Sequence, residues 1–314
     1  MRRFAFAALA LALSSAALAA EPPAEPITPT ENQLRGENLD EATEKVTIET
    51  EDGWELAGLY VQGVNKGEKN HKCRAVILVH MLGREKNDWK PLMKRFYGNG
   101  CAVLAFDLRG HGASVRADGV ARPWRKFKRR DWAAAEKDIL AARDWLLKNK
   151  ETVDPDRIAL VGASIGANLC LRALGRDEKL RGAVLLSPGL DYRGVTTEDA
   201  LERVRPGQRV AAFACSNDLQ SATCVRTLER MLQAFERERR ESFTAKVYSG
   251  RTITAATGGL HGTRMLGRVK GIEEEVLDFL NSALAPRAEE EQKEKKEETK
   301  PSLDRTLDAL RRAL

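Results

Sequence analysis

A serine stands between two glycines in "GASIG" (162–166), where a run of strand-forming residues gives way to a helical pattern. The spacing is G-x-S-x-G, in which the serine occupies a tight turn with unfavourable backbone angles. Side chains two positions before and after it would collide with the adjoining strand and helix, so both positions need glycine. The pattern predicts that Ser164 is held out as a nucleophile. The alternative is a turn that serves packing alone.

A serine hydroxyl is a weak nucleophile near neutral pH and needs a base, which is usually histidine. The chain has four histidines, at positions 71, 80, 111 and 261. His71 lies in a charged loop, whereas His80 and His111 lie upstream of the serine. His261, in "TGGLHGTRML", follows the last expected strand, and its glycine neighbours leave it room to reach Ser164. We therefore expect His261 to be the base; the alternative is a loop histidine that bonds only locally.

The base must be oriented by a carboxylate that also stabilises its cation. Asp218 follows the strand "RVAAFAC" and gives the chain order Ser, Asp, His. It is the expected partner of His261, with a turn aspartate that caps the next helix as the alternative. Asp191, which follows the preceding strand, is the reserve candidate.

Acyl transfer also requires hydrogen-bond donors for the oxyanion. The backbone N–H of Ile165 directly follows the serine, and the loop "HMLG" (80–83) follows an expected strand. We expect the Leu82 and Ile165 amides to form the oxyanion hole, with His80 as a structural support of that loop. The glycine-rich "FDLRGHGAS" (106–114) lacks the G-K-[ST] ending of a phosphate-binding loop.

These residues depend on an alternation of short apolar runs and amphipathic segments. A hairpin is expected at "KVTIET" and "ELAGLYV", turning at Asp52-Gly53. Six further strands are expected at 74–80, 101–108, 157–163, 182–187, 209–215 and 244–249. Helices are expected between them, including 131–149 and 221–238. The pattern predicts an α/β fold: a three-layer α/β/α sandwich with about eight strands in a mostly parallel sheet.

Composition divides the chain into four parts. Residues 1–19 have two arginines, a short apolar core and "ALA", as in a secretory signal peptide that is cleaved after Ala19. Residues 20–44 are proline-rich and polar and are expected to be an extended leader, before one domain over 45–285. Residues 286–314 are a charged tether and a short helix with one leucine stripe, which docks on the domain, on a second copy or on a membrane surface. A periplasmic or secreted protein is expected.

Export bears on the five cysteines, because disulfides persist outside the cytosol. Cys73 with Cys101, and Cys215 with Cys224, are candidate pairs, and free buried thiols are the alternative. No CxxC pair occurs, which argues against a cysteine zinc site. The formal charge of +6 comes from interleaved acids and bases, and no nucleic-acid partner is expected. The basic segment 115–130 either attracts anions or is simply solvated, and its Trp124 and Phe127 are candidates for the pocket mouth.

Residues 45–285 resemble an α/β-hydrolase, nearest the dienelactone-hydrolase-like and bacterial serine esterase members. The resemblance is carried, in order, by "VHMLG", "FDLRGHGAS", "VDPDRIALVGASIGAN", "SND" and "GGLHGT". It implies Ser164 as nucleophile, His261 as general base, Asp218 as its partner and the amides of Leu82 and Ile165 as oxyanion donors. Met81 departs from the glycine that many relatives carry there. Only about twenty residues separate the strands that end near 187 and begin near 209, so no large lid is expected.

The expected activity is hydrolysis of carboxylic esters with small or short-acyl groups through an acyl-enzyme, with no metal or organic cofactor. The substrate is then a small-molecule ester. One alternative is a peptidase or amidase on the same fold, which would need an added segment to select peptides. Another is a catalytically silent binding protein that keeps the fold.

Overall fold

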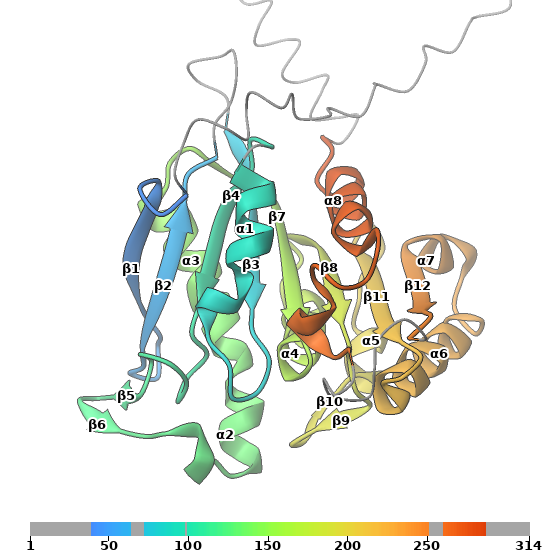
Figure 1. The fold of residues 1–314 in the computed structure, drawn as a ribbon, viewed down its shortest axis with the longest axis horizontal. Coiled ribbons are helices and arrows are strands. Elements are labelled where there is room, and N and C mark those ends of the chain that lie inside the picture. Colours follow the sequence, from blue (N-terminus) through green and yellow to red (C-terminus); the bar gives the residue numbers. More distant parts are fainter. Residues whose placement is uncertain (1–38, 64–71, 98, 251–259, 287–314) are drawn as a thin grey trace, which may run out of the picture.

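The computed structural model describes residues 39–63, 72–97, 99–250 and 260–286. Its main feature is one eight-stranded sheet in the order β1-β2-β4-β3-β7-β8-β11-β12 (Figure 1). The strands are β1 (Thr43–Glu49), β2 (Glu55–Val61), β3 (Cys73–Val79), β4 (Ala102–Phe106), β7 (Val153–Ala163), β8 (Leu180–Leu186), β11 (Arg209–Cys215) and β12 (Phe243–Tyr248). Two short hairpins lie outside it, β5 (Arg116–Ala117) with β6 (Val120–Ala121) and β9 (Asp191–Tyr192) with β10 (Val195–Thr196).

The six sheet strands from β3 onward follow the expected apolar runs and are parallel wherever they pair with one another, whereas β4 pairs antiparallel with β2. Every residue of β4 and β8 is buried, as continuous aliphatic strands require when helices cover both faces. The expected N-terminal hairpin is also present, since β1 pairs antiparallel with β2. Gly53 has φ +80° in its turn, a conformation that glycine adopts without steric cost.

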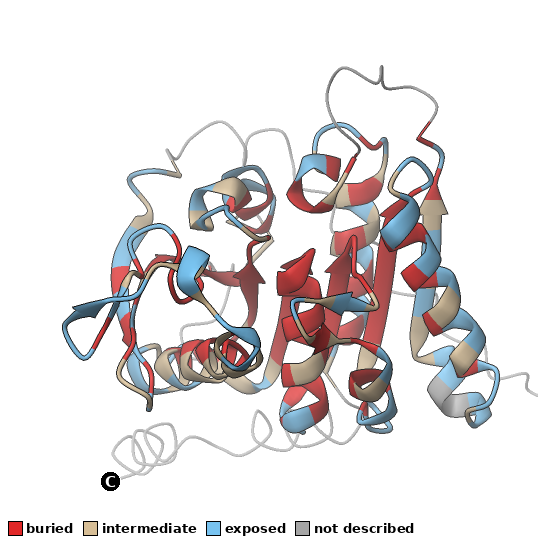
Figure 2. Ribbon diagram, turned by 90° about the horizontal axis from the view of Figure 1, so that it is seen from below, coloured by how far each residue is buried: buried red, intermediate tan, exposed pale blue. Residues whose placement is uncertain are grey.

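Helices cover both faces of the sheet and make it the middle of three layers. The helices are α1 (Lys90–Tyr97), α2 (Arg129–Ala134), α3 (Glu136–Asn149), α4 (Ile165–Arg176), α5 (Glu198–Glu202), α6 (Leu219–Leu232), α7 (Arg237–Glu241) and α8 (Ile272–Ala283), with 3-10 turns at Lys86–Trp89, Trp124–Lys126 and Gly262–Met265. One buried cluster joins the sheet to α1 and α8, and the other joins it to α3, α4 and α6. Figure 2 shows the buried strands between helices whose outer sides are exposed. The expected three-layer α/β fold is therefore confirmed.

Two expected helices differ in detail. The segment 131–149 is divided into α2 and α3 at Ala135, where the backbone tightens to i→i+3 hydrogen bonds. The segment 221–238 contains α6 and a separate short α7. Between β8 and β11 lie one short helix, α5, and the β9–β10 hairpin. The hairpin was not expected from the sequence. There is no large lid between these strands.

All five cysteines are free and buried, so neither candidate disulfide is present in the structure. Burial raises the pKa of the Cys215 and Cys224 thiols to about 11, which keeps them protonated near neutral pH. The expected signal peptide and C-terminal helix lie outside the described residues. Within the described ranges, no helix is both long and apolar enough to span a membrane.

Candidate active site

Ser164 lies at the junction of β7 and α4 with φ 54° and ψ −122°, a conformation that residues with a side chain rarely adopt. Its amide donates to the Leu186 carbonyl at 2.8 Å, which ties the turn to β8. The flanking glycines are sterically required. A Cβ on Gly162 would lie 2.3 Å from the Gly166 carbonyl oxygen, and one on Gly166 would lie 2.4 Å from that of Val79. The turn therefore depends on both glycines.

His261 directly precedes the 3-10 turn Gly262–Met265, and its Nδ1 lies 2.6 Å from Oδ2 of Asp218. Asp218 also caps α6, since its Oδ1 accepts the Ser221 N–H at 3.4 Å. The helix-cap role that had been the alternative thus coexists with the contact to histidine. Burial would raise the pKa of the Asp218 carboxyl, but hydrogen bonds from His261 and Ser221 outweigh it and hold that pKa below its ordinary value. Asp218 therefore remains an anion beside the imidazole near neutral pH.

Ser164 and His261 line one cavity of about 440 Å³. Its lining residues are Met81, Leu82, Ser164, Ile165, Asp191, Tyr192, Arg193, Gln220, His261 and Arg264. In the described part of the chain, no hydrogen bond joins the side chains of Ser164 and His261. Such catalytic hydrogen bonds are often long without substrate and tighten when it binds. The structure thus brings serine and imidazole to one cavity, with the carboxylate behind the imidazole.

The two expected oxyanion donors, Leu82 and Ile165, line the same cavity. Ile165 is the first residue of α4, where backbone N–H groups have no acceptor within the helix. Leu82 follows Met81, whose carbonyl accepts from His80 Nδ1 at 2.8 Å and from the Arg84 amide at 3.1 Å. In a trans peptide the C=O and N–H point in opposite directions. Fixing the Met81 carbonyl therefore also fixes the direction of the Leu82 N–H.

The other described histidines are buried and do not line the cavity. His80 Nε2 accepts the Leu108 N–H at 2.9 Å, so the proton lies on Nδ1 and both ring nitrogens are used. His80 thus joins the loop after β3 to the loop after β4, which fits its expected role as a support. His111 stacks on Trp124 with ring centroids 5.3 Å apart. His71 lies outside the described residues.

Asp191, the reserve acid, does not contact His261. Its carboxylate accepts the Gly194 N–H at 2.5 Å and lies 3.4 Å from the Arg129 guanidinium. Trp124 and Phe127 also differ from expectation, since neither lines the cavity with Ser164. Phe127 packs edge-on against Trp54 with centroids 5.7 Å apart. Their aromatic rings are used to pack the basic segment onto the domain.

Tyr192 is a cavity residue that the sequence analysis missed. Its ring meets that of His261 edge to face at 6.2 Å, and its hydroxyl lies 3.3 Å from Ser221 Oγ. Burial raises the pKa of the phenol, although hydrogen bonds with Ser221 and Ser164 act in the opposite direction. The phenol therefore remains neutral near neutral pH. The only sequence feature that could have indicated a place for Tyr192 in the cavity is its position shortly after β8, at the edge of the sheet where the strands that precede Ser164 and Asp218 also end.

Within the described ranges, no three histidine, cysteine, aspartate or glutamate side chains gather so as to hold a metal ion. The cavity is therefore lined by Ser164, by His261 with the Asp218 carboxylate beside it, and by Leu82 and Ile165. This set of groups is suited to nucleophilic acyl transfer.

The fold is shared with solved structures at low sequence identity. An esterase from Pyrococcus furiosus superposes with a TM-score of 0.60 at 18% identity, over 84% of this chain and 97% of the other. An acylaminoacyl peptidase from Pyrococcus horikoshii gives a TM-score of 0.50 at 12% identity, over 66% of this chain and 36% of the other. At such identities the comparison shows the fold alone.

Curated relatives match only parts of the chain. An uncharacterized protein from Mycobacterium tuberculosis is 32% identical over 143 residues, which is 46% of this chain and 44% of the relative. A protein named hydrolase acrC from Aspergillus aculeatus is 34% identical over 98 residues, 31% of this chain and 21% of the relative. The chain thus spans less than half the length of these relatives. The model described as "Alpha/beta hydrolase family" matches residues 76–281, and the chain accordingly belongs to the alpha/beta hydrolase family.

Proposed function

We propose that this protein is a serine hydrolase that cleaves small carboxylic esters. The observation that carries the proposal is the 2.6 Å contact between His261 Nδ1 and Asp218, with Ser164 and His261 in one cavity. The backbone strain at Ser164 adds support, because such strain is stored mainly at functional sites. Family membership makes hydrolysis the natural reaction class.

In the proposed reaction, the Ser164 hydroxyl attacks the ester carbonyl while His261 Nε2 takes its proton. Asp218 stabilises the resulting imidazolium through Nδ1–H. The Leu82 and Ile165 amides donate to the oxyanion of the tetrahedral intermediate. When the intermediate collapses, the alcohol leaves with the proton from His261 and an acyl-serine remains. Water, deprotonated by His261, then attacks the acyl group and releases the acid.

Esters are favoured over peptides because the described residues include no large insertion next to the cavity. Between β8 and β11 the chain adds only the β9–β10 hairpin and α5. A cavity of about 440 Å³ is of the size that holds small ligands. Short p-nitrophenyl esters compared with matched p-nitroanilides separate an esterase from a peptidase or amidase.

The test is hydrolysis of p-nitrophenyl acetate and butyrate by the purified protein and by Ser164→Ala. We expect the wild type to release p-nitrophenol and Ser164→Ala to lose activity about 10³-fold or more. Ser282→Ala is the control, since this exposed serine of α8 does not line the cavity. Equal rates in wild type and Ser164→Ala would show that the serine is not the nucleophile. A folded wild type that cleaves no ester would favour a silent binding protein.

We also propose that the protein is exported to the periplasm or secreted, on the evidence of residues 1–19 alone. Expression of the full chain in a bacterial host, followed by N-terminal sequencing, tests this proposal. A mature chain that begins at Ala20 is expected. An intact N-terminus on protein recovered from the cytosol would contradict export.

A further inference from the structure

The short β9–β10 hairpin carries three cavity residues, Asp191, Tyr192 and Arg193. Its two-residue turn is Arg193-Gly194, with φ 60° and 90°. Positive φ at both turn positions is typical of type I′ hairpins, which favour asparagine and glycine. An arginine is strained there because its Cβ crowds the backbone. Arg193 is thus a residue with a strained backbone that lines the cavity.

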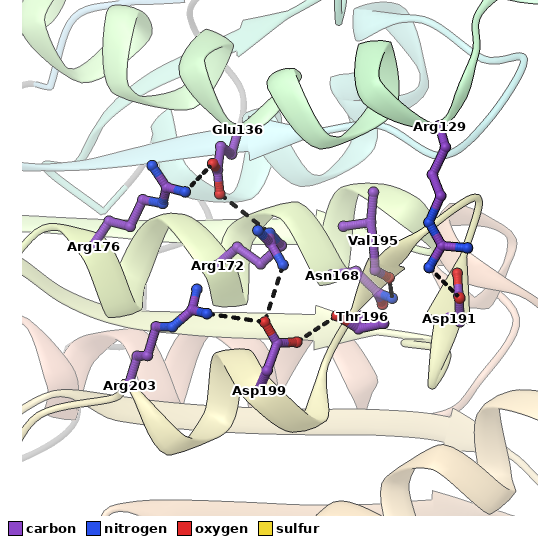
Figure 3. Close-up of polar contacts among 10 residues, drawn as sticks. All are labelled: Arg129, Glu136, Asn168, Arg172, Arg176, Asp191, Val195, Thr196, Asp199 and Arg203. Carbon is purple, nitrogen blue, oxygen red and sulfur yellow. Dashed lines mark hydrogen bonds and ion pairs between the residues drawn. The ribbon is translucent and has the colours of Figure 1, made fainter.

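The hairpin is held firmly on α4, one turn beyond Ser164. The side-chain amide of Asn168, fully buried, donates to the carbonyls of Gly189 and Val195 at 2.7 Å each and accepts the Gly189 N–H at 3.1 Å. Figure 3 shows Asn168 between α4 and the hairpin. Asn168 therefore holds the chain both before β9 and directly after the turn of the hairpin.

Ion pairs fix the following segment to the same helix (Figure 3). Arg172 of α4 lies 3.2 Å from Glu136 of α3 and 3.3 Å from Asp199 of α5. Asp199 also accepts a hydrogen bond from Thr196 of β10. Arg193 is thus presented by a segment with fixed supports, although its own side chain is exposed.

Two exposed arginines line the cavity, Arg193 from the hairpin and Arg264 from the 3-10 turn that follows His261. Neither forms an ion pair with a carboxylate in the described part of the chain. Asp191 also lines the cavity, and its exposed carboxylate lies 3.4 Å from the Arg129 guanidinium, while Asp218 lies beside His261. Among the described residues, Arg193 and Arg264 are therefore the charged side chains of the cavity lining that lack an oppositely charged partner.

We propose that Arg193 and Arg264 bind a carboxylate carried by the substrate, so that the preferred esters are anionic. The inference rests on the proposed esterase function and names its substrate class. Guanidinium groups bind carboxylates through charge-assisted and often bidentate hydrogen bonds. The carboxylate belongs either to the acyl part, as in a half ester of a short dicarboxylic acid, or to the alcohol part.

The surroundings favour the approach of such anions. Arg129, at the start of α2 in the basic segment 115–130, would meet a Cβ placed on Gly194 of the hairpin at 2.5 Å. The basic segment is thus adjacent to the hairpin at the cavity. Clustered positive charge raises the local concentration of anions and their association rate at low salt.

The experiment compares kcat/KM for two matched pairs of esters. The acyl pair is mono-p-nitrophenyl glutarate and p-nitrophenyl butyrate, and the alcohol pair is 4-acetoxybenzoate and phenyl acetate. We expect at least one charged member to be preferred by about tenfold at low salt. Because both arginines are exposed, the preference should shrink when ionic strength rises from about 0.01 M to about 1 M. The pair that shows the preference locates the carboxylate.

The variant is the double substitution Arg193→Asn with Arg264→Gln. Asparagine tolerates positive φ, so the turn is kept while the charge is removed. The ratio of charged to neutral ester should fall to about one. Arg268→Gln is the matched control, an exposed arginine of the same segment that does not line the cavity. It should keep the wild-type ratio.

Two results would overturn the inference while leaving the esterase function intact: a wild type that cleaves neutral esters without preferring either charged one, or a preference that survives the double substitution. Failure of the esterase function looks different, because no ester is cleaved and a fluorophosphonate does not label Ser164. A binding readout is independent of turnover. Glutarate should slow fluorophosphonate labelling more than butyrate does, and equal effects would count against a carboxylate site.

Discussion

At the scale of single residues, the turn around Ser164 depends on the absence of side chains at Gly162 and Gly166. The backbone of α4 approaches the end of β3 so closely that a Cβ on Gly166 would lie 2.4 Å from the Val79 oxygen and 2.5 Å from the His80 oxygen. These contacts involve backbone, which cannot move aside as a flexible side chain could. Ser164 can occupy its turn only because Gly166 lets the backbone of α4 lie this close to the end of β3.

Gly166→Ala should therefore destabilise the protein by about 1–3 kcal/mol, the usual cost of overpacking, and lower esterase activity as α4 shifts. Urea unfolding and kcat on p-nitrophenyl butyrate measure the two effects. Gly267→Ala is the control, since its Cβ would meet no atom within 4 Å and adds only the cost of φ +71°. Equal behaviour of the two variants would refute the steric explanation.

The second prediction concerns the choice between two aspartates. Asp218→Asn should lower turnover by about 10⁴-fold and leave the fold intact, because the imidazole loses the carboxylate that orients it and stabilises its cation. Asp191→Asn should have a far smaller effect, because Asp191 contacts Gly194 and Arg129 instead of His261. Rates are measured by ester hydrolysis and the fold by circular dichroism. A greater loss in Asp191→Asn would show that the acid is misassigned.

Some of the site was predictable from residue types and order alone. Ser164, Asp218 and His261 each follow a strand that ends at the same edge of the sheet, so the topology of a parallel sheet brings them together. Tyr192 and Arg193 could not be predicted in this way. They lie on a hairpin with two residues in each strand, too short for a periodic pattern, and their position depends on Asn168, which is distant in sequence.

At the scale of elements, the parallel strands were predictable because each is a continuous aliphatic run covered on both faces. The division of 131–149 into α2 and α3 was not, because the apolar spacing runs through Ala135 without a proline or glycine. The fixed placement of the segment between β8 and β11 was also unpredictable. It comes from polar contacts between Asn168, Arg172 and residues of the hairpin and α5.

The element-scale prediction concerns this attachment. Asn168→Ala removes three buried hydrogen bonds, to the Gly189 and Val195 carbonyls and from the Gly189 N–H, while the Gly189 carbonyl keeps the Thr197 hydroxyl as a donor. This loss should cost about 2–4 kcal/mol and release the hairpin. Amide hydrogen exchange in 189–197 should then accelerate, and KM for esters should rise. Asn149→Ala at the end of α3 is the control, because it removes a single hydrogen bond from an exposed amide to the Trp145 carbonyl. Unchanged exchange in Asn168→Ala would mean that the hairpin has other sufficient supports.

At the scale of the whole molecule, the buried histidines couple stability to pH. Burial, aided by the neighbouring His80, lowers the pKa of His111 to about 4 from an ordinary value of about 6.5. As the pH falls below about 6.5, His111 takes up a proton in the unfolded chain, whereas in the folded protein it stays neutral until the pH approaches 4. Stability is therefore complete above that pH and is lost as the pH falls towards 4, by about 3 kcal/mol for this group.

His111→Phe removes the pH dependence of stability that comes from His111 and keeps an aromatic ring beside Trp124. The free energy of unfolding of the wild type, relative to the variant, should fall as the pH is lowered from about 7 to about 4.5. Urea unfolding of both proteins across this range gives the difference directly. The acidic residues common to both proteins cancel in that comparison. A difference that does not change with pH would contradict the assignment of His111 as a buried neutral imidazole.

The central claim for the whole molecule is that one serine, raised on the turn between β7 and α4, is the reactive nucleophile. Labelling with a fluorophosphonate, followed by mass mapping of peptides, tests it most directly. The account predicts one adduct, on the peptide that contains Ser164, absent in Ser164→Ala and formed much more slowly in His261→Gln. An active protein that stays unlabelled at Ser164, or carries its adduct on another serine, would contradict the account.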